Sequence, residues 1–343
     1  MTVVRIIADD LTGALDAAAP FATPADPVHL SIDPALPQPE IKRTVSSESR
    51  ECPLSTALEQ VQGAFARIRL GPGDRTLWFK KVDSVLRGWP VEETLELMRL
   101  TNLRLCVFAP AFPDMGRRTV RGFHEVADPE RPDLWGPAAI HDLRAAFERQ
   151  GAKAALFDGR GAASGIVIGN AVSQDDLRDL VRRVSGREVL WAGSRGLAEA
   201  LCSPSKAIDC PRIGTIVVGT THPVTRRQTK ALLESGGGDV VLIDPVPQAR
   251  SEEETSRFLH EAIVRLERPR NHALMVVGGK TLMIVLAAAK AQSLACAGEI
   301  GPGLPLSRII GGRLDGLEVV TKSGGFGRTE LFLTLSAAGL TAS

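Results

Sequence analysis

Short apolar segments alternate with amphipathic segments along most of the chain, and many of the apolar segments end in a polar or glycine-rich turn. The apolar runs predict buried strands and the amphipathic segments predict helices. The first series of predicted strands covers residues 3–8, 76–80, 103–109, 166–169 and 189–192. The predicted helices cover residues 12–19, 54–68, 91–100, 143–150 and 175–184. This alternation is typical of a mostly parallel sheet with helices on both faces.

A second series of the same kind comes after a segment with two prolines, residues 204–214, which we interpret as an inter-domain connection. Its predicted strands cover residues 215–218, 240–243 and 273–277, and its predicted helices cover 223–234, 252–266 and 282–292. A length of 343 residues also fits two domains better than one. The sequence therefore predicts an α/β protein with two domains, 1–205 and 212–343, each a mostly parallel sheet flanked by helices.

Composition narrows the class of protein. The 41 basic residues balance the 40 acidic ones, which argues against a nucleic-acid partner and against a polybasic membrane binder. The five cysteines show no metal-ligand spacing, as expected for reduced thiols. The N-terminus becomes acidic within ten residues, unlike a signal peptide, and no apolar run is long enough to span a membrane. These features predict a cytoplasmic protein.

Two charged segments come directly after predicted strands of the first domain, where ligands bind in open parallel sheets. Asp9 and Asp10 end the first strand, and either carboxylate can accept a hydrogen bond from a polyol or act as a base. A helix N-cap is the alternative interpretation, since capping needs only one aspartate. The second segment contains Lys81, Asp83 and Arg87, and its cations can hold a substrate carboxylate. Here the alternative is a solvated charged turn.

A third candidate segment covers residues 109–124. Its prolines predict a rigid loop, and its basic residues are suited to an anionic ligand. His124 by itself is weak evidence for a site, because a lone histidine more often has a structural role.

Three glycine-rich turns occur in the second domain, at residues 219–222, 278–281 and 322–327. Glycine lets backbone N–H groups approach a phosphate at a helix N-terminus, where the helix dipole favours an anion. The turn at 278–281 is not a Walker A loop, because Leu274 occupies the position of its first glycine. A plain turn before a helix remains an alternative for it. No strand–helix turn carries a GxGxxG fingerprint, which argues against an NAD site.

These motifs, in this order, resemble those of the four-carbon acid sugar kinase family. The resemblance extends over nearly the whole chain and is carried above all by IADDLTGALDAA at 7–18, SSESR at 46–50, KKVDSVLRG at 80–88, VVGTTHPVTRRQ at 217–228, VVGGKT at 276–281 and VVTKSGGFG at 319–327. It implies a sugar-acid substrate domain followed by a nucleotide-binding domain, with the active site in the cleft between them. It also implies ATP and Mg²⁺, with products such as phosphorylated threonate, erythronate or 3-oxo-tetronate.

The resemblance also implies site residues. Those matched to the sugar acid are Asp9, Asp10, Arg50, Lys81, Asp83 and Arg87; those matched to the nucleotide are Gly219, Thr220, Gly279, Ser323, Gly324, Gly325 and Gly327. In this hypothesis Arg87, Arg50 or Lys81 holds the carboxylate of the substrate. Asp83, Asp9 or Asp10 accepts the proton of the attacking hydroxyl. The ligands of the metal stay unassigned at this point, and a homodimer is compatible with the sequence.

The chain departs from the family pattern on the nucleotide side. Thr220, Thr221 and His222 stand where the family is serine-rich, and Lys280 stands where it has an acidic residue. An acidic side chain there would suit a ribose hydroxyl, whereas a lysine favours phosphate. The alternative function is therefore a diverged member that binds a sugar acid or nucleotide without transferring phosphate. A third class, an NAD-dependent dehydrogenase, fits the fold but lacks the fingerprint.

Overall fold

The computed structural model describes residues 3–32, 42–69, 76–128, 131–159, 164–203, 207–236, 240–249, 251–267 and 272–338. The chain forms two compact units, the first from Met1–Phe21 and Pro39–Ser205 and the second from Ala22–Gln38 and Lys206–Ser343. Strand β2 (Val28–Ser31) belongs to the second unit, although the sequence placed residues 1–205 in the first domain, because it pairs in antiparallel fashion with β15 (Ser293–Glu299).

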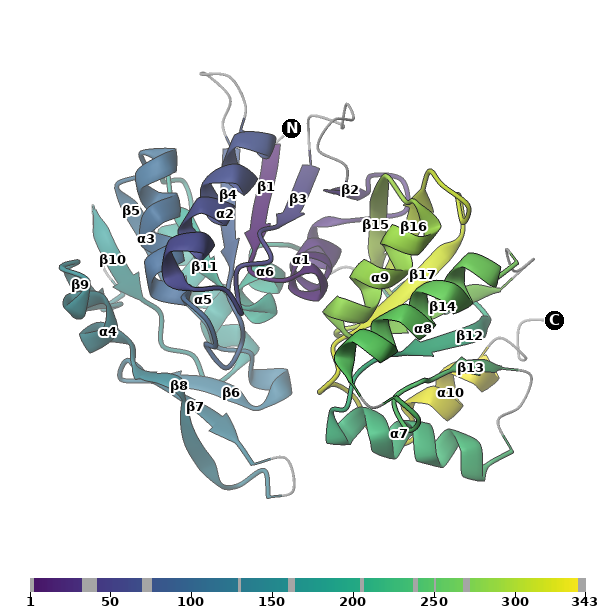
Figure 1. The fold of residues 1–343 in the computed structure, drawn as a ribbon. Helices are drawn as coiled ribbons and strands as arrows, with labels where there is room; N and C mark the ends of the chain where they lie inside the picture. Colours follow the sequence, from purple (N-terminus) through teal and green to yellow (C-terminus); the bar gives the residue numbers. More distant parts are fainter. Residues whose placement is uncertain are drawn as a thin grey trace. The chain divides into compact units, whose positions relative to one another are not determined.

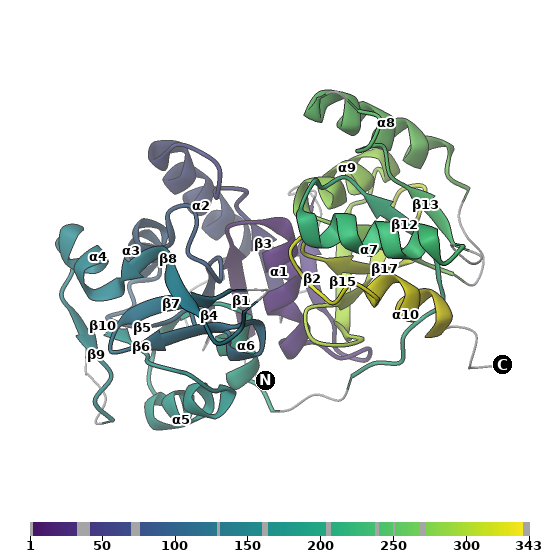
Figure 2. The same ribbon diagram turned by 90° about the horizontal axis from the view of Figure 1, so that it is seen from below.

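The first unit contains a parallel sheet in the order β3-β1-β4-β11-β5-β10-β9. The strands are β1 (Val3–Ala8), β3 (Lys42–Ser46), β4 (Thr76–Lys81), β5 (Leu105–Ala109), β9 (Ala154–Leu156), β10 (Gly165–Ile168) and β11 (Leu190–Gly193). Its helices are α1 (Leu11–Ala18), α2 (Leu54–Ile68), α3 (Pro90–Thr101), α4 (Leu143–Arg149), α5 (Gln174–Val184) and α6 (Arg195–Ala200). Helices α2 and α3 cover one face of the sheet, and α5 and α6 cover the other (Figure 2).

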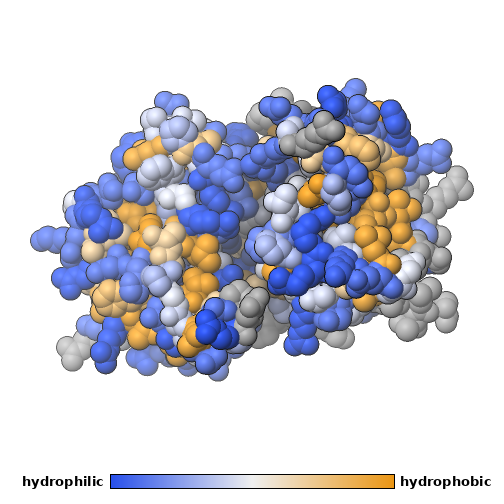
Figure 3. Space-filling model, turned by 60° about the horizontal axis from the view of Figure 1, so that its bottom comes forward, coloured by the Kyte–Doolittle hydropathy of each residue, from blue (hydrophilic) through white to orange (hydrophobic). Residues whose placement is uncertain are grey.

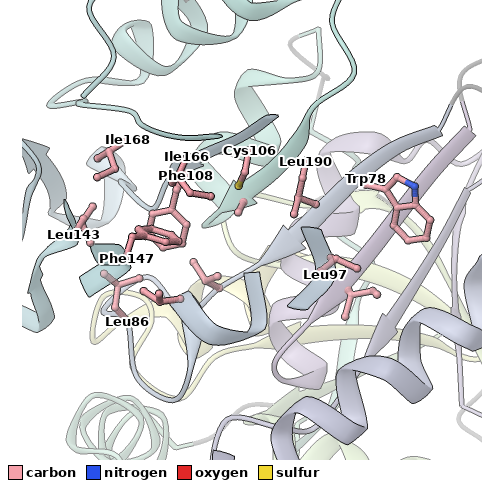
Figure 4. Close-up of a cluster of buried hydrophobic side chains, with 14 of the residues drawn as sticks. Trp78, Leu86, Leu97, Cys106, Phe108, Leu143, Phe147, Ile166, Ile168 and Leu190 are labelled. Carbon is pink, nitrogen blue, oxygen red and sulfur yellow. The ribbon is translucent and has the colours of Figure 1, made fainter. Parts of the chain in front are cut away.

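The main core of this unit lies between the sheet and helices α2, α3 and α4. Phe108 of β5 and Phe147 of α4 pack edge to face with ring centroids 5.1 Å apart, close to Leu143 in the cluster drawn in Figure 4. The strands that build this core are buried on both faces, which explains why they form continuous apolar runs in the sequence.

Residues 117–142 form a separate antiparallel sheet, β6-β7-β8, and this corrects the predicted loop at 109–124. The strands are β6 (Arg117–Val120), β7 (Phe123–Ala127) and β8 (Trp135–Asp142), preceded by a short 3₁₀ turn at Pro113–Met115. Their positions alternate between more and less exposed, as expected for a sheet with one solvated face, so they lack the apolar run that marks the parallel strands.

The second unit contains a mixed sheet in the order β13-β12-β14-β17-β16-β15-β2. Strands β12 (Ile213–Val218), β13 (Val241–Ile243), β14 (Ala273–Val277) and β17 (Glu318–Lys322) are parallel, whereas β16 (Pro305–Ile310) and β15 run antiparallel to their neighbours. Helices α7 (Pro223–Glu234) and α10 (Leu331–Ala338) cover one face, and α8 (Glu252–Arg265) and α9 (Gly279–Ala289) the other (Figures 1 and 2). The α/β class with two sheets flanked by helices is thus confirmed.

On the face shown in Figure 3, hydrophobic residues gather in patches on both units, with hydrophilic residues around them. No helix within the described ranges is both long and apolar enough to cross a membrane.

Candidate functional site

Three neighbouring parallel strands bring the charged segments of the first unit together. In the register of the sheet, Ala8 at the end of β1 lies beside Ser46 at the end of β3 and Lys81 at the end of β4. The residues that come after these strands therefore leave the sheet at the same edge. This places Asp9, Arg50 and Asp83 in one cluster, as the sequence predicted for the sugar-acid side.

Arg50 is the centre of that cluster. Its Nε and Nη2 atoms donate to the two carboxylate oxygens of Asp9 at 2.8 and 2.9 Å, and its Nη1 atom donates to Asp10 at 2.9 Å. Asp83 lies 3.8 Å from the same guanidinium. Burial opposes ionisation of Asp9, but the charge and hydrogen bonds of Arg50 outweigh it and lower the pKa of Asp9. The pKa of Arg50 is raised well above its ordinary value, because the three carboxylates outweigh burial.

Asp83 and Arg87 form a second two-point ion pair within one turn. Arg87 donates from Nε at 2.9 Å and from Nη2 at 2.8 Å, and its backbone N–H donates to the same carboxylate at 3.1 Å. Leu86 between them adopts a left-handed φ of 63°, which closes the turn. Burial opposes ionisation of Asp83, but Arg87 and Arg50 hold its pKa far below the usual range. The Arg87 side chain remains 60% exposed, and its Nη1 atom has no partner among the described residues.

The two lysines that end β4 have different surroundings, because successive strand residues point to opposite faces. Lys80 is fully buried against Glu93 of α3, with Nζ 2.7 Å from the carboxylate. It therefore forms an ion pair in the interior and is closed to a ligand. Lys81 points toward the start of α1: its Nζ donates to the Val82 carbonyl at 2.9 Å and lies 3.3 Å from the position that a Cβ on Gly13 would occupy. Of the pair, Lys81 is the one that lies by Gly13 and the Asp10 carboxylate, whereas the charges of both lysines act on Asp9.

Asp10 also caps helix α1, which was the alternative interpretation of the first motif. Its Oδ1 accepts from the backbone N–H of Gly13 at 2.8 Å, and its Oδ2 accepts from the Thr12 hydroxyl at 2.9 Å. The Asp10 side chain therefore caps α1 and also belongs to the charged cluster around Arg50. Asp10 is also the most accessible of the three carboxylates, at 20% exposed against 6% for Asp9 and 8% for Asp83.

Two basic residues of the 109–124 segment, Arg118 and His124, are held by neighbouring groups. Arg118 donates to Glu125 at 2.7 Å and stacks over the Trp135 ring at 3.9 Å. His124 is buried, and its ring nitrogens lie within hydrogen-bond distance of the Thr119 hydroxyl, at 3.0 Å, and the Ser84 carbonyl, at 2.9 Å. Burial lowers the pKa of His124 and keeps the ring neutral near pH 7. His124 thus supports the turn that carries Asp83.

The glycine turns of the second unit meet at the carboxyl ends of β12, β14 and β17. Gly219 packs directly on Thr281, whose hydroxyl oxygen lies 2.6 Å from where a Cβ on the glycine would be. Gly278, with φ of 98°, donates its N–H to the Lys322 carbonyl at 2.8 Å. A Cβ on Gly324 would lie 3.1 Å from the Thr220 hydroxyl.

The close packing of these turns explains the glycine positions. It brings Gly219, Thr220, Ser323, Gly324 and Gly325 into one group of turns, beside Gly279 at the first position of α9. Gly327, with φ of 90°, closes the last turn against Leu331 of α10. An assembly of glycine turns at parallel strand ends, next to a helix N-terminus, is suited to a phosphate-bearing ligand.

The two family departures both have structural partners. His222 caps helix α7 by accepting the Val224 N–H on Nδ1 at 3.2 Å. Lys280 pairs with Glu252 of α8, with Nζ 2.8 Å from the carboxylate. A carboxylate therefore lies beside position 280 although the residue itself is a lysine.

Sequence reasoning included Lys322 of β17 in the turn at 322–327 but gave it no role in the site. Its side chain is 1% exposed and lies beneath the loop 323–328, with Nζ 2.8 Å from the carbonyl oxygens of Ser323 and Phe326. The available signal was a lysine at the last position of an apolar strand, followed at once by a glycine-rich loop. No group of three His, Cys, Asp or Glu side chains suited to a metal ion occurs among the described residues.

Comparison with known proteins matches both units. Residues 4–201 match the family described as "Sugar-binding N-terminal domain", and residues 246–332 match the one described as "Nucleotide-binding C-terminal domain". The chain belongs to this sugar-binding, nucleotide-binding family. The resemblance found in the sequence motifs is thereby confirmed.

Full-length relatives and solved structures agree with this assignment. A Bordetella bronchiseptica protein named D-threonate kinase is 27% identical over 98% of this chain and 97% of its own length. A Salmonella typhimurium protein of the same name is 25% identical over 94% of this chain and 95% of its own. Solved structures of a protein described as a "putative tRNA synthase" from S. typhimurium (TM-score 0.73, 18% identity, 97% of this chain and 98% of that one) and of a Haemophilus influenzae protein (0.69, 17%, 98% and 100%) share the fold.

Proposed function

We propose that the protein is an ATP-dependent kinase that phosphorylates a hydroxyl of a four-carbon sugar acid, of the threonate, erythronate or 3-oxo-tetronate type. The observation that carries the proposal is the cluster of Asp9, Asp10, Asp83, Arg50, Arg87 and Lys81 at one sheet edge, in a chain whose other unit brings three glycine turns together. The full-length relatives named D-threonate kinase support the same activity.

The charge pattern of the cluster suits a small molecule that carries both a carboxylate and hydroxyls. Arg87 keeps its Nη1 atom toward solvent while Asp83 fixes the rest of its guanidinium, so it is preorganised to bind a carboxylate. Lys81 adds a second cation. The aspartate oxygens are hydrogen-bond acceptors for the hydroxyls. This division of roles is the one that a hydroxy acid requires.

Among the three candidate bases, we assign proton acceptance to Asp10. The pKa values of Asp9 and Asp83 are lowered by their arginine partners, which makes both carboxylates weak proton acceptors. Asp10 is the most accessible of the three carboxylates, so a substrate hydroxyl can reach it most easily. Asp9 and Asp83 then act by holding Arg50 and Arg87 in position. Phosphoryl transfer depends mainly on positioning and charge neutralisation, so this supporting role is substantial.

The nucleotide side of the proposal rests on the turns at 219–220, 278–279 and 323–327. Their glycines allow the close backbone approach that a triphosphate needs. The described residues supply no metal cluster of their own, and Mg²⁺ commonly binds through substrate phosphates and water. We therefore expect Mg²⁺ to arrive bound to ATP and assign it no residue.

The test is ADP release from ATP·Mg with D- and L-threonate, D- and L-erythronate and their 3-oxo forms. We expect turnover with one or two of these acids. Arg87→Met should raise KM for the acid more than KM for ATP, whereas the exposed control Arg144→Met should change neither. A folded protein that releases no ADP with any acid would contradict the proposal.

A non-catalytic family member is the second candidate, and the substitutions at His222 and Lys280 favour it. Calorimetry with ATP·Mg separates the two candidates. Binding of ATP and of an acid without turnover would favour the non-catalytic protein, and turnover would exclude it.

A further inference from the structure

One buried lysine, Lys322, donates hydrogen bonds to the backbone of the loop 323–328 that comes after β17. Lys322 Nζ donates to the carbonyl oxygens of Ser323 and Phe326 at 2.8 Å and lies 3.4 Å from the Gly324 carbonyl and the Thr225 hydroxyl. No carboxylate among the described residues lies within ion-pair distance of it. Backbone carbonyls are thus the main partners of this ammonium group.

Two side chains of α7 complete the same arrangement. The Thr225 hydroxyl donates to the Gly324 carbonyl at 2.6 Å. Gln228 Nε2 donates to the carbonyls of Phe326 and Arg328, both at 2.9 Å. Four carbonyls of the loop, at residues 323, 324, 326 and 328, therefore point toward α7 and Lys322.

The direction of the carbonyls fixes the direction of the amides. In a trans peptide the C=O of one residue and the N–H of the next point in opposite directions. Inward carbonyls at 323, 324 and 326 therefore turn the N–H groups of Gly324, Gly325 and Gly327 outward. These three N–H groups make no hydrogen bond to any described residue. A set of outward amides is the backbone arrangement that binds an anion.

We infer that Lys322 is a positioning residue for the nucleotide: it holds the loop carbonyls inward so that the amides of Gly324, Gly325 and Gly327 face a phosphate group. The inference rests on the proposed kinase function. Lys322 itself does not touch the phosphate, because its ammonium lies on the carbonyl side of the loop. Burial lowers its pKa to about 7, and a neutral amine still has the two N–H donors that the carbonyls at 2.8 Å require.

Calorimetry of the full chain with ATP·Mg and with adenosine tests this role. Lys322→Met removes the donors and keeps a similar volume. We expect ATP affinity to fall roughly tenfold for each amide–phosphate hydrogen bond that is lost, with adenosine affinity unchanged. Thr225→Val and Gln228→Leu should weaken ATP binding selectively as well. Lys230→Met, an exposed lysine on the same α7, should match wild type.

Three results would overturn the inference. One is wild-type ATP affinity in Lys322→Met. Another is an equal loss for ATP and adenosine, which would indicate general damage to the unit. The third is a loss in Lys322→Met alone, with Thr225→Val and Gln228→Leu normal, which would mean that the lysine contacts the phosphate directly. If Lys322→Met fails to fold, the Thr225→Val and Gln228→Leu variants provide the test: wild-type ATP affinity in both would contradict the inference. Absence of ATP binding by the wild type would instead contradict the proposed function.

Discussion

Replacing Arg50 with methionine should destabilise the first unit strongly, and more at neutral than at acidic pH. Arg50 is 16% exposed and neutralises Asp9 and Asp10 directly, with Asp83 at 3.8 Å. Methionine fills a similar volume without a charge, so the variant leaves carboxylates in a poorly solvated place without their shared cation. Removing one member of a buried ion pair costs about 3–5 kcal/mol, and we expect a loss in this range at pH 7.

The pH dependence is set by the direction of the pKa shifts. In the wild type the pKa values of Asp9 and Asp83 lie below those of the unfolded chain, near 3.9. Their contribution to stability is therefore present above about pH 4 and is lost as the pH falls through the lowered native values. In Arg50→Met, burial without the cation raises the pKa of Asp9, which costs stability as the pH rises. The difference between the two proteins should therefore grow from pH 3 to pH 7.

Tryptophan fluorescence during urea unfolding measures this loss in the first unit alone. All four tryptophans, at positions 78, 89, 135 and 191, lie there, and the chain has no tyrosine. Arg144→Met is the matched control, because Arg144 is exposed and, among the described residues, pairs with Glu148 on its own helix. That pair should contribute about 0.3–0.5 kcal/mol. A loss below about 1 kcal/mol for Arg50→Met, or one that does not vary with pH, would refute the reasoning.

Two further predictions concern neighbouring groups. Asp10→Asn keeps a good N-cap for α1, so it should lower kcat about 100-fold while changing the free energy of unfolding by only about 1 kcal/mol; a normal kcat in steady-state assays would exclude Asp10 as the base. Glu93→Gln leaves Lys80 charged in the interior and should cost about 3–5 kcal/mol in urea unfolding, whereas Lys80→Met combined with Glu93→Leu should recover most of it. Equal losses in the single and double variants would show that the ion pair is not what matters there.

Most of the parallel strands could be predicted from the sequence because burial on both faces forces continuous apolar runs. The parallel strands β3 and β9 were missed, since KRTVS and AAL are not continuous buried apolar runs. The same reasoning located the aspartates, since the carboxyl ends of neighbouring parallel strands, and the turns attached to them, lie at one edge of the sheet. The antiparallel strands β6, β7 and β8 were not predicted by this criterion. Their alternating exposure leaves each strand short of apolar residues, and the prolines at 110 and 113 favoured a loop.

Contacts that depend on the register of neighbouring strands could not be predicted from the sequence. Lys80 and Lys81 are adjacent and chemically identical, yet one is buried against Glu93 and the other lies beside Gly13. Strand alternation predicts that they differ, but which one faces α1 depends on how β4 aligns with β1. The strand β2 joined the second unit for a related reason, because its partner β15 is more than 260 residues away in the chain.

The two candidate sites use arginine and lysine in different ways, because their cations bind different kinds of oxygen. In the first unit Arg50 and Arg87 bind side-chain carboxylates, which fixes acidic groups in place for a substrate. In the second unit Lys322 binds backbone carbonyls, which fixes amides in place. The cation nearest the glycine loop in sequence is thus a support of the site, whereas Lys280, a departure from the family pattern, is paired with Glu252. A buried cation beside a glycine loop is therefore better judged by the carbonyls it binds than by the anion it is expected to attract.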